Sequence, residues 1–379
     1  MAGKVAVVSW AQTEYREAHD ETIRELVFRV AREALDRAGL TREELGTVIT
    51  ASSDYWQGIS CSNEYYLDAA GGYLKSGAKA EEDGALAFMY AFMRVASGHF
   101  DTALVVAVTK GSEIPPPAAL THLYSEPFFQ RPVGIDGVNA AAMQARLYVR
   151  ERGAAPEHFA RVVVKNLSNA ARNPVACRRR APTVEEVLQA PVVADPLRGW
   201  DLAPGADGAC ALLLAGEDTA RRLTDRPVWV RGVGWSVSSY YLGDRDLLDG
   251  SLPDAARRAY RMAGIANPRA EIRVAEVCEE YSFQELLWCE QLGLCGPGEG
   301  PRLLEEGVTA PGGELPVNPS GGVLAGNPYC ARGLVRIIEA AAQVAGRAGE
   351  HQVEGAHTAL AHSCHGLAGQ LHSVVILGR

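Results

Sequence analysis

The chain has 379 residues, of which 47% are hydrophobic and 22% charged, so it has enough apolar material for a large folded core. Its formal net charge is −9 at pH 7, and its basic run Arg178–Arg180 is short. Binding to the phosphates of a nucleic acid needs clustered lysine and arginine, so this composition excludes nucleic acid as an expected partner.

The chain shows no targeting signal and no membrane span. The apolar stretch 5–10 is too short for the core of a signal peptide. No apolar run approaches the roughly 18 residues that span a bilayer. The eight cysteines are scattered without a C-x-x-C pair, so neither a metal site nor a disulfide framework is expected. A cytoplasmic protein with free thiols is the simplest interpretation.

The first part of the chain predicts alternating strands and helices. Apolar or β-branched stretches predict strands at 5–10, 47–51 and 103–108. Apolar residues at helical spacing predict helices at 21–38, ended by Gly39, and at 85–96. The continuous apolar run at 103–108 is typical of a strand buried on both faces of a parallel sheet.

A long excursion follows at about 110–205. It is rich in proline at its start and contains two amphipathic stretches that predict helices at 137–152 and 156–173. Long excursions from an α/β unit are usually lids or interface elements. The apolar stretch 207–215 then predicts a buried strand that closes the first half.

The second half repeats the pattern of the first. Residues 31–39 are echoed by residues 256–264, and each copy precedes a predicted strand, at 47–51 and 273–278. A later helix and strand, 333–346 followed by Thr358 onward, match the earlier pair in the same order. Such a domain-sized repeat indicates gene duplication about a pseudo-two-fold axis. We expect one half at 1–225 and the other at 226–379.

Five short motifs occur in the order found in thiolases. They are Asp207–Ala209 (D-G-A), Glu285–Gly293 (E-L-x-x-x-E-x-L-G), Asn318–Gly322 (N-P-S-G-G), Gly326–Pro328 in place of G-H-P, and Cys364–Gly366 in place of C-x-G. Over essentially its whole length the chain therefore resembles the thiolase superfamily, in particular its sterol-carrier-protein-type branch. The resemblance implies an α/β protein with a thiolase-like duplicated five-layer α/β/α/β/α fold. It also implies a homodimer paired through the first halves, and coenzyme A as substrate or acyl carrier.

The chain departs from the thiolase pattern at the reacting groups. Thiolases carry a nucleophilic cysteine at the start of a helix ending in A-S-G, and counting back from Val95–Gly98 assigns that position to Glu81. Asn327 replaces the histidine of G-H-P, and Cys278 corresponds to the histidine of H-D-C-F. Of the usual set only Cys364 remains. A carboxylate cannot hold an acyl group as a thioester, so a ping-pong mechanism through Glu81 is not expected.

Three functions remain open, of which the first is preferred. A retro-aldol cleavage of a 3-hydroxyacyl-CoA needs only an acid/base group and a site that stabilises an enolate. Thiolase-like aldolases of steroid side-chain degradation resemble this chain in lacking the nucleophile, and they work with a zinc-ribbon/OB-fold partner. A thiolase-type acyltransferase using Cys364 or Cys278 on a 3-oxoacyl-CoA is the second; benzoylsuccinyl-CoA thiolase resembles it in having such a partner. A catalytically silent CoA-binding scaffold subunit is the third.

The resemblance also predicts a set of site residues. A tyrosine is expected to serve as acid/base, because a phenol can exchange a proton with a β-hydroxyl. Backbone amides of the glycine-rich turn and nearby polar groups are expected to polarise the thioester carbonyl. The predicted residues are Tyr329 or Tyr240 as acid/base; Cys364, Asn327, Cys278 and Glu81 in the pocket; and Asn318, Gly321, Gly322, His365 and Gly366 in the oxyanion-binding loops.

Overall fold

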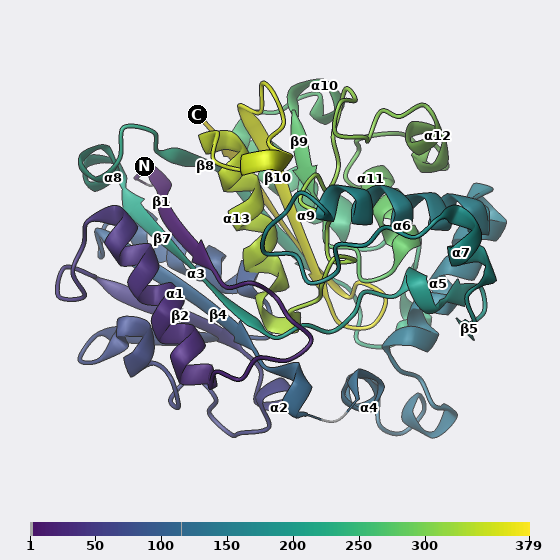
Figure 1. Ribbon diagram of the computed structural model, residues 1–379, viewed down its shortest axis with the longest axis horizontal. Coiled ribbons are helices and arrows are strands. Elements are labelled where there is room, and N and C mark those ends of the chain that lie inside the picture. Colours follow the sequence, from purple (N-terminus) through teal and green to yellow (C-terminus); the bar gives the residue numbers. More distant parts are fainter. Residues whose placement is uncertain (1–2, 115) are drawn as a thin grey trace.

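A computed structural model describes residues 3–114 and 116–379 (Figure 1). Within the described residues nine strands form one mixed sheet in the order β3-β2-β4-β7-β1-β8-β11-β10-β9. These strands are β1 (Val5–Gln12), β2 (Thr47–Ser52), β3 (Ser76–Glu81), β4 (Thr102–Thr109), β7 (Gly208–Gly216), β8 (Val228–Val237), β9 (Val274–Glu276), β10 (Thr358–His365) and β11 (Leu371–Gly378). A separate hairpin pairs β5 (Val192–Ala194) with β6 (Leu197–Arg198).

The strand order shows the duplication. β1 and β8 pair antiparallel at the middle of the sheet, and the order on one side mirrors that on the other. β7 corresponds to β11, β4 to β10 and β2 to β9. Beyond β9, Val317 bridges Ala275 in parallel, which is the place that β3 takes in the first half. The repeat therefore relates the two halves about an axis between β1 and β8. The expected boundary at 225/226 lies in the connection before β8.

Helices form three layers around the two halves of the sheet. α1 (Ile23–Ala38) covers the outer face of the first half, and α9 (Leu252–Ala263) and α11 (Ser282–Gln291) cover that of the second. α3 (Gly84–Ala96) and α13 (Arg332–Ala345) pack together between the halves, and α13 runs through the middle of the molecule (Figure 1). This arrangement confirms the thiolase-like five-layer α/β/α/β/α fold.

Alternation along β4 explains how one strand serves two layers. Leu104, Val106 and Val108 pack with α1, whereas Val105 and Ala107 pack in the core shared with α3 and α13. Successive side chains of a strand point to opposite faces, so a strand between two helical layers must be apolar throughout. The continuous apolar run at 103–108 follows from this burial on both faces of the strand.

The predicted elements agree with the structure apart from their ends. α1 begins after Thr22, whose side chain and Glu25 form a capping box, and it ends at Gly39 with φ of +66°. The predicted strand 273–278 is shorter, because β9 ends at Glu276. The excursion contains α4 (Pro117–His122), α5 (Gly137–Arg152), α6 (Pro156–Ala170) and α7 (Val184–Gln189). The remaining helices are α2 (Asp54–Gln57), α8 (Glu217–Leu223), α10 (Pro268–Glu271) and α12 (Gly300–Glu305).

A search of the described residues finds no helix with the length and apolar character needed to cross a membrane.

Two glycines allow α3 and α13 to start in contact. A Cβ on Gly333 would lie 2.1 Å from Asp83 Oδ1, and a Cβ on Gly84 would lie 2.7 Å from the Leu334 Cβ. Asp83 caps α3, because its Oδ1 accepts the Ala85 N–H at 2.9 Å. The two helices therefore begin side by side, and their N-terminal ends face the same space.

We expect Gly333→Ala to lower the free energy of unfolding by about 2–3 kcal/mol, because the added methyl must displace Asp83 from its cap and overfill the contact. Denaturant unfolding followed by circular dichroism measures the change. Gly243→Ala is the control, since a Cβ there meets nothing within 4 Å, and it should stay within about 0.5 kcal/mol of wild type. Equal losses in the two variants would contradict the role given to the helix contact.

Candidate active site

A cleft opens where α3 and α13 begin. It has a volume of about 560 Å³, its open mouth included, and the loops after β3, β9 and β10 contribute to its wall. Six residues with ionisable side chains in the lining bear on its chemistry: Glu82, Asp83, Glu280, Tyr329, Arg332 and His365. A partly enclosed cavity with convergent polar groups is the best position for an active site.

Glu82 has an unusual backbone and environment. Its φ is +63°, in the left-handed region that non-glycine residues rarely adopt. Its side chain is 14% exposed, Oε1 accepts the Trp56 Nε1–H at 3.1 Å, and Oε2 lies 3.6 Å from His365 Nδ1. Burial raises the pKa of Glu82 to about 7, against the opposing effect of the Arg332 charge. This carboxyl therefore changes its protonation state near neutral pH.

Arg332 supplies a fixed positive charge. It forms an ion pair with Glu280 Oε1, and its Nη2 donates to the Cys364 carbonyl at 2.9 Å. Burial acts to lower the pKa of Arg332, but Glu280 and the neighbouring thiols outweigh it, and the net shift is upward. Asn327 Nδ2 donates to the same Glu280 oxygen at 3.2 Å, whereas its buried Oδ1 finds no partner among the described residues. Arg332 lines the cleft and offers a cation to a developing negative charge, whereas the predicted Asn327 lies behind the lining and supports Glu280.

The structure brings only one of the two predicted tyrosines to the cleft. The Tyr329 ring stacks on Trp56, with ring centroids 4.0 Å apart and planes at 17°. Burial, and then the nearby Glu280, raise the pKa of the Tyr329 phenol. Tyr240 is 46% exposed, and its hydroxyl lies 3.3 Å from the Ser125 carbonyl, away from the lining. Of the two tyrosines, Tyr329 is therefore the one whose side chain lines the cleft.

The predicted thiols lie behind the cleft wall. Cys278 and Cys364 are both buried, and the Cys364 thiol donates to the Cys278 carbonyl at 3.4 Å. Burial raises the pKa of Cys278, but the Cys364 thiol and Arg332 outweigh it, and the net shift is downward. The pKa of Cys364 is raised, first by that same thiol contact. Cys330 does line the cleft, and burial raises the pKa of its thiol to well above the ordinary value.

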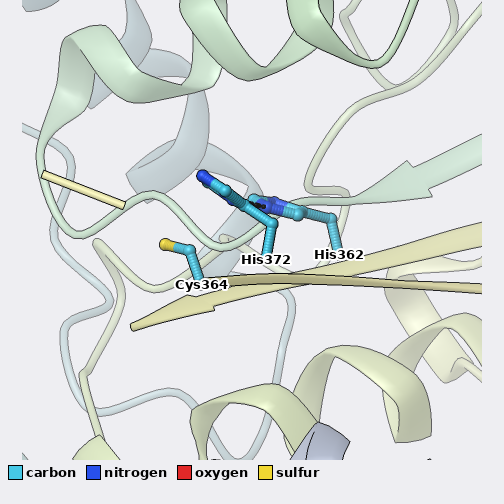
Figure 2. A group of neighbouring side chains, drawn as sticks. All are labelled: His362, Cys364 and His372. Carbon is cyan, nitrogen blue, oxygen red and sulfur yellow. Dashed lines mark hydrogen bonds between the residues drawn. The ribbon is translucent and has the colours of Figure 1, made fainter. Parts of the chain in front are cut away.

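Cys364 also belongs to a buried group with two histidines, shown in Figure 2. The ligand-type atoms of His362, Cys364 and His372 lie within 4.8 Å of one another. His362 Nδ1 accepts the Cys278 N–H at 3.3 Å, so its proton is on Nε2, which donates to His372 Nδ1 at 3.0 Å. His372 in turn hydrogen-bonds to the Gly369 backbone.

That hydrogen-bonded chain uses the lone pairs that a metal would need. Burial lowers the pKa of His372 to about 3 and that of His362 well below its ordinary value, so both rings are neutral. A cation bound by both rings would require His362 to give up its bond from the Cys278 amide. The group therefore fits a fixed chain of neutral imidazoles better than a metal centre.

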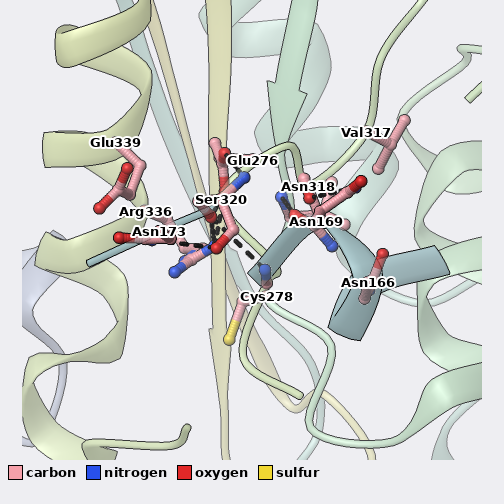
Figure 3. Close-up of polar contacts among 12 residues, drawn as sticks. Asn166, Asn169, Asn173, Glu276, Cys278, Val317, Asn318, Ser320, Arg336 and Glu339 are labelled. Carbon is pink, nitrogen blue, oxygen red and sulfur yellow. Dashed lines mark hydrogen bonds and ion pairs between the residues drawn. The ribbon is translucent and has the colours of Figure 1, made fainter. Parts of the chain in front are cut away.

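The N-P-S-G-G turn is held by buried carboxylates (Figure 3). Asn318 Nδ2 donates to Glu279 and Glu285, at 2.9 Å in each case. The Ser320 hydroxyl donates to Glu276 at 2.6 Å, and Arg336 pairs with the same carboxylate at 2.5 Å.

The amides of this turn are also occupied. Those of Ser320 and Leu324 donate to glutamates, that of Gly321 to the Asn318 carbonyl and that of Gly322 to Ser320 Oγ. This arrangement favours a structural role for the turn, including Gly321 and Gly322, over the expected contact with a thioester carbonyl.

Glu81 is another predicted residue outside the cleft, and it lies beside a neighbour that the sequence did not single out. Glu81 ends β3 as an exposed residue, and its carboxylate pairs with Lys79 at 2.8 Å. Glu82, the next residue, lines the cleft, as do the predicted His365 and Gly366. The sequence signal was the acidic run before Gly84, but the direction of each side chain depends on the positive φ at Glu82.

Other lining residues carried no recognisable signal in the sequence. Arg332 lies at the start of a helix that the sequence predicts only through its place in the repeat, and Glu280 follows a short strand. Trp56 lies in a four-residue helix, α2, that was not predicted.

Comparison with known proteins agrees with the resemblance seen in the motifs. A family described as thiolase C-terminal domain-like matches residues 234–379. An acetyl-CoA acetyltransferase of Methanothermobacter thermautotrophicus is 33% identical over 376 residues, which cover 96% of this chain and 97% of that protein. The benzoylsuccinyl-CoA thiolase subunit BbsB of Thauera aromatica is 33% identical over 56% of each chain.

Solved structures show the same fold. An Ltp2–ChsH2(DUF35) aldolase superposes with a TM-score of 0.84 at 24% identity, covering 100% of this chain and 98% of that one. Human mitochondrial 3-ketoacyl-CoA thiolase in complex with CoA superposes with a TM-score of 0.75 at 17% identity, covering 100% and 99%. A protein of this fold therefore binds CoA.

We expect Glu82→Gln to stabilise the protein at pH 8 by about 1–3 kcal/mol. A rise in pKa from 4.5 to about 7 makes ionisation of the folded protein costly, at about 1.4 kcal/mol per unit. Below pH 4.5 the group is protonated in both the folded and the unfolded protein, so it costs no stability there. Between pH 4.5 and about 7 only the unfolded protein ionises, so the free energy of unfolding falls across this range. The advantage of the variant should therefore be near zero at pH 4.5 and reach its full value above pH 7.

Denaturant unfolding at a series of pH values measures this difference. Glu81→Gln is the matched control, because that side chain is exposed, and it should show no such dependence. A Glu82→Gln advantage that is the same at every pH would contradict the raised pKa.

Proposed function

The chain belongs to the thiolase superfamily, and from that premise we propose that it cleaves the Cα–Cβ bond of a 3-hydroxyacyl-CoA by a retro-aldol reaction. Its family makes it an acyl-CoA enzyme. The observation that carries the finer proposal is the chemistry of the cleft, which presents carboxyls, a phenol and a guanidinium. The thiol in its wall, Cys330, has a raised pKa, and Cys278 and Cys364 are buried behind the wall. This set of groups supports proton transfer better than acyl transfer to sulfur.

The proposed roles follow from the positions of the groups. Tyr329, the predicted acid/base residue, contacts the β-oxygen and donates a hydrogen bond to it. As the Cα–Cβ bond breaks, its electron pair moves onto the thioester, and the enolate that forms needs positive charge beside it. Arg332 provides that charge, and the Asn327 amide lies next to it on Glu280. A proton returned to Cα completes a shortened acyl-CoA, and the β-carbon leaves as a carbonyl compound.

We also propose a partner for the region beside the cleft. The segment between α4 and α5 exposes Phe128, Phe129 and Val133, by 79%, 73% and 72%, while its neighbours Tyr124 and Gly137 line the cleft. A group of exposed apolar side chains favours a protein contact. The solved aldolase of similar fold is a complex. A small zinc-ribbon/OB-fold subunit on a homodimeric core is the partner that we propose.

The setting of the reaction is part of the same proposal. Steroid side-chain degradation is the pathway that the resemblance favours. A cytoplasmic location agrees with the eight free cysteines.

An acyltransferase is the second candidate, and a specific observation favours it. The thiols of Cys278 and Cys364 lie together, and the pKa of Cys278 is lowered. The Methanothermobacter thermautotrophicus relative, which aligns over 97% of its own length, is an acetyl-CoA acetyltransferase. Thiolysis of a 3-oxoacyl-CoA would require the wall to open so that this pair reaches the substrate.

Turnover of 3-hydroxyacyl-CoA and 3-oxoacyl-CoA panels distinguishes these functions. We expect the 3-hydroxyacyl-CoA compounds to be cleaved to a carbonyl compound and a shorter acyl-CoA. We expect little thiolysis of the 3-oxoacyl-CoA compounds. Tyr329→Phe should lower kcat by about 10²- to 10³-fold, since it removes the hydroxyl that hydrogen-bonds to the β-oxygen. Tyr73→Phe is the control, because that ring is 60% exposed and lies outside the cleft lining.

Three results would overturn the assignment or a part of it. Thiolysis that disappears in Cys364→Ala would establish the acyltransferase. Full cleavage activity in Tyr329→Phe, with loss in Tyr240→Phe, would transfer the acid/base role to the exposed tyrosine. Absence of turnover with either panel, even with the partner subunit present, would leave the scaffold function.

A further inference from the structure

We propose that Glu82 is the catalytic group that carries the proton between the β-hydroxyl of the substrate and Cα. This inference rests on the proposed reaction for the identity of the substrate. The movement of a proton at the carbon next to a thioester, however, is common to aldol and Claisen chemistry, so the role can be tested apart from the reaction class.

The backbone directs this side chain into the cleft. The Glu82 N–H donates to the Ser52 carbonyl at the end of β2, at 3.0 Å, and the Asp83 N–H donates to the Glu81 carbonyl at 2.9 Å. These bonds hold Glu82 at positive φ, a conformation that costs free energy and persists only where its surroundings fix it. As a result Glu81 and Glu82 diverge, one to Lys79 at the surface and the other into the cleft.

The three carboxyls of the cleft are not equally free to exchange protons. Asp83 is committed to the cap of α3 and also accepts the Ser363 hydroxyl at 3.1 Å. Glu280 is committed to its ion pair with Arg332 and to the Asn327 amide. Glu82 has only the Trp56 N–H on Oε1, which it shares with the closer Tyr124 hydroxyl, and within the described chain Oε2 faces His365 without a hydrogen bond. Glu82 is therefore the carboxyl that can both accept and give a proton.

The groups around Glu82 leave it near half-protonation at neutral pH. Trp56 from α2 donates to it, and Arg332 from α13 favours its charged form. Glu81 before it and Glu280 after β9 oppose that charge. His365 from β10 is no permanent counter-ion, because burial lowers the pKa of its imidazole to about 4. A general acid–base group works best with its pKa near the working pH.

Tyr329 needs such a partner. The raised pKa of its phenol keeps it protonated, so it can donate a hydrogen bond to the β-oxygen but is a poor final acceptor of the hydroxyl proton. Trp56 lies between the two groups, stacked on the Tyr329 ring and donating to Glu82. Both groups therefore lie within reach of one ligand in the cleft.

The step balances without any co-reactant. The Glu82 carboxylate takes the proton of the β-hydroxyl, the O–H electron pair becomes the second bond of the new carbonyl group, and the Cα–Cβ pair passes into the thioester enolate. The protonated Glu82 then gives that proton to Cα. The products are a carbonyl compound and an acyl-CoA, and the carboxylate is restored.

The test is deuterium exchange at Cα of acetyl-CoA in D₂O, followed by mass spectrometry, beside cleavage of 3-hydroxyacyl-CoA. We expect the wild-type exchange rate to rise with pH through about 7, as the carboxylate forms. Glu82→Gln should lower both rates by about 100-fold or more and abolish that rise. Glu82→Asp should retain part of the activity with a shifted profile. Glu81→Gln, the matched control, should stay within about twofold of wild type.

The outcomes separate the two proposals. Exchange that depends on Glu82, without cleavage of any 3-hydroxyacyl-CoA, would overturn the retro-aldol reaction and keep the role of Glu82. Normal cleavage or exchange in a folded Glu82→Gln protein would overturn the role and keep the reaction. A wild-type protein that neither exchanges nor cleaves would overturn both. Circular dichroism and the pH dependence of unfolding show whether each variant is folded.

Discussion

The close contact between the starts of α3 and α13 is the constraint on which the cleft depends. Both helices lie between the two halves of the sheet, and Gly84 and Gly333 remove the side chains that would hold them apart. Duplication about the β1–β8 axis supplies one helix from each half, so two N-terminal ends open into the same space. The positive end of a helix dipole favours negative charge, and here two of them lie together. A thioester enolate formed at this point would meet that field as well as Arg332.

A second consequence of the fold is the way in which it neutralises its buried carboxylates. Glu276, Glu279 and Glu285 are buried, and the N-P-S-G-G turn supplies four of their hydrogen bonds, from Asn318 and Ser320. Burial of an unpaired charge would cost several kcal/mol, so the turn is fixed by the need to satisfy these groups. Gly322 shows how tight the fit is, since a Cβ there would lie 1.9 Å from Glu279 Oε1. The motif most easily recognised in the sequence thus fixes Glu279, the residue before Glu280 of the cleft.

The fold could be predicted from the sequence further than the site could. α1 and β4 were visible because their periodicity and caps are local properties of the chain, and the duplication was visible as a repeated order of elements. β3 is a polar edge strand, and glycines interrupt β8. Both are defined by pairing with strands far away in the sequence, so no local pattern predicted them. In the site, Tyr329, His365 and Gly366 line the cleft, in loops that the motifs mark in the sequence. The sequence predicts Glu81 and not Glu82, because counting along a helix gives no information on a positive φ. It does not predict Arg332, because the role of that residue depends on Glu280, which lies 52 residues earlier.

The protonation state of Glu82 depends on how Arg332 is paired. A carboxyl so little exposed would be protonated at neutral pH if burial acted alone, and it would be ionised if the full charge of Arg332 faced it. Glu280 takes up most of that charge in an ion pair, and His365 stays neutral, so neither extreme applies. The ion pair of Arg332 with Glu280 thus has two consequences. It fixes a cation for the thioester, and it leaves the neighbouring Glu82 carboxyl near the midpoint of its titration at neutral pH. Acid–base chemistry at a carbon next to a thioester requires both conditions at once, and the crossing of α3 and α13 supplies them from the two halves of the fold.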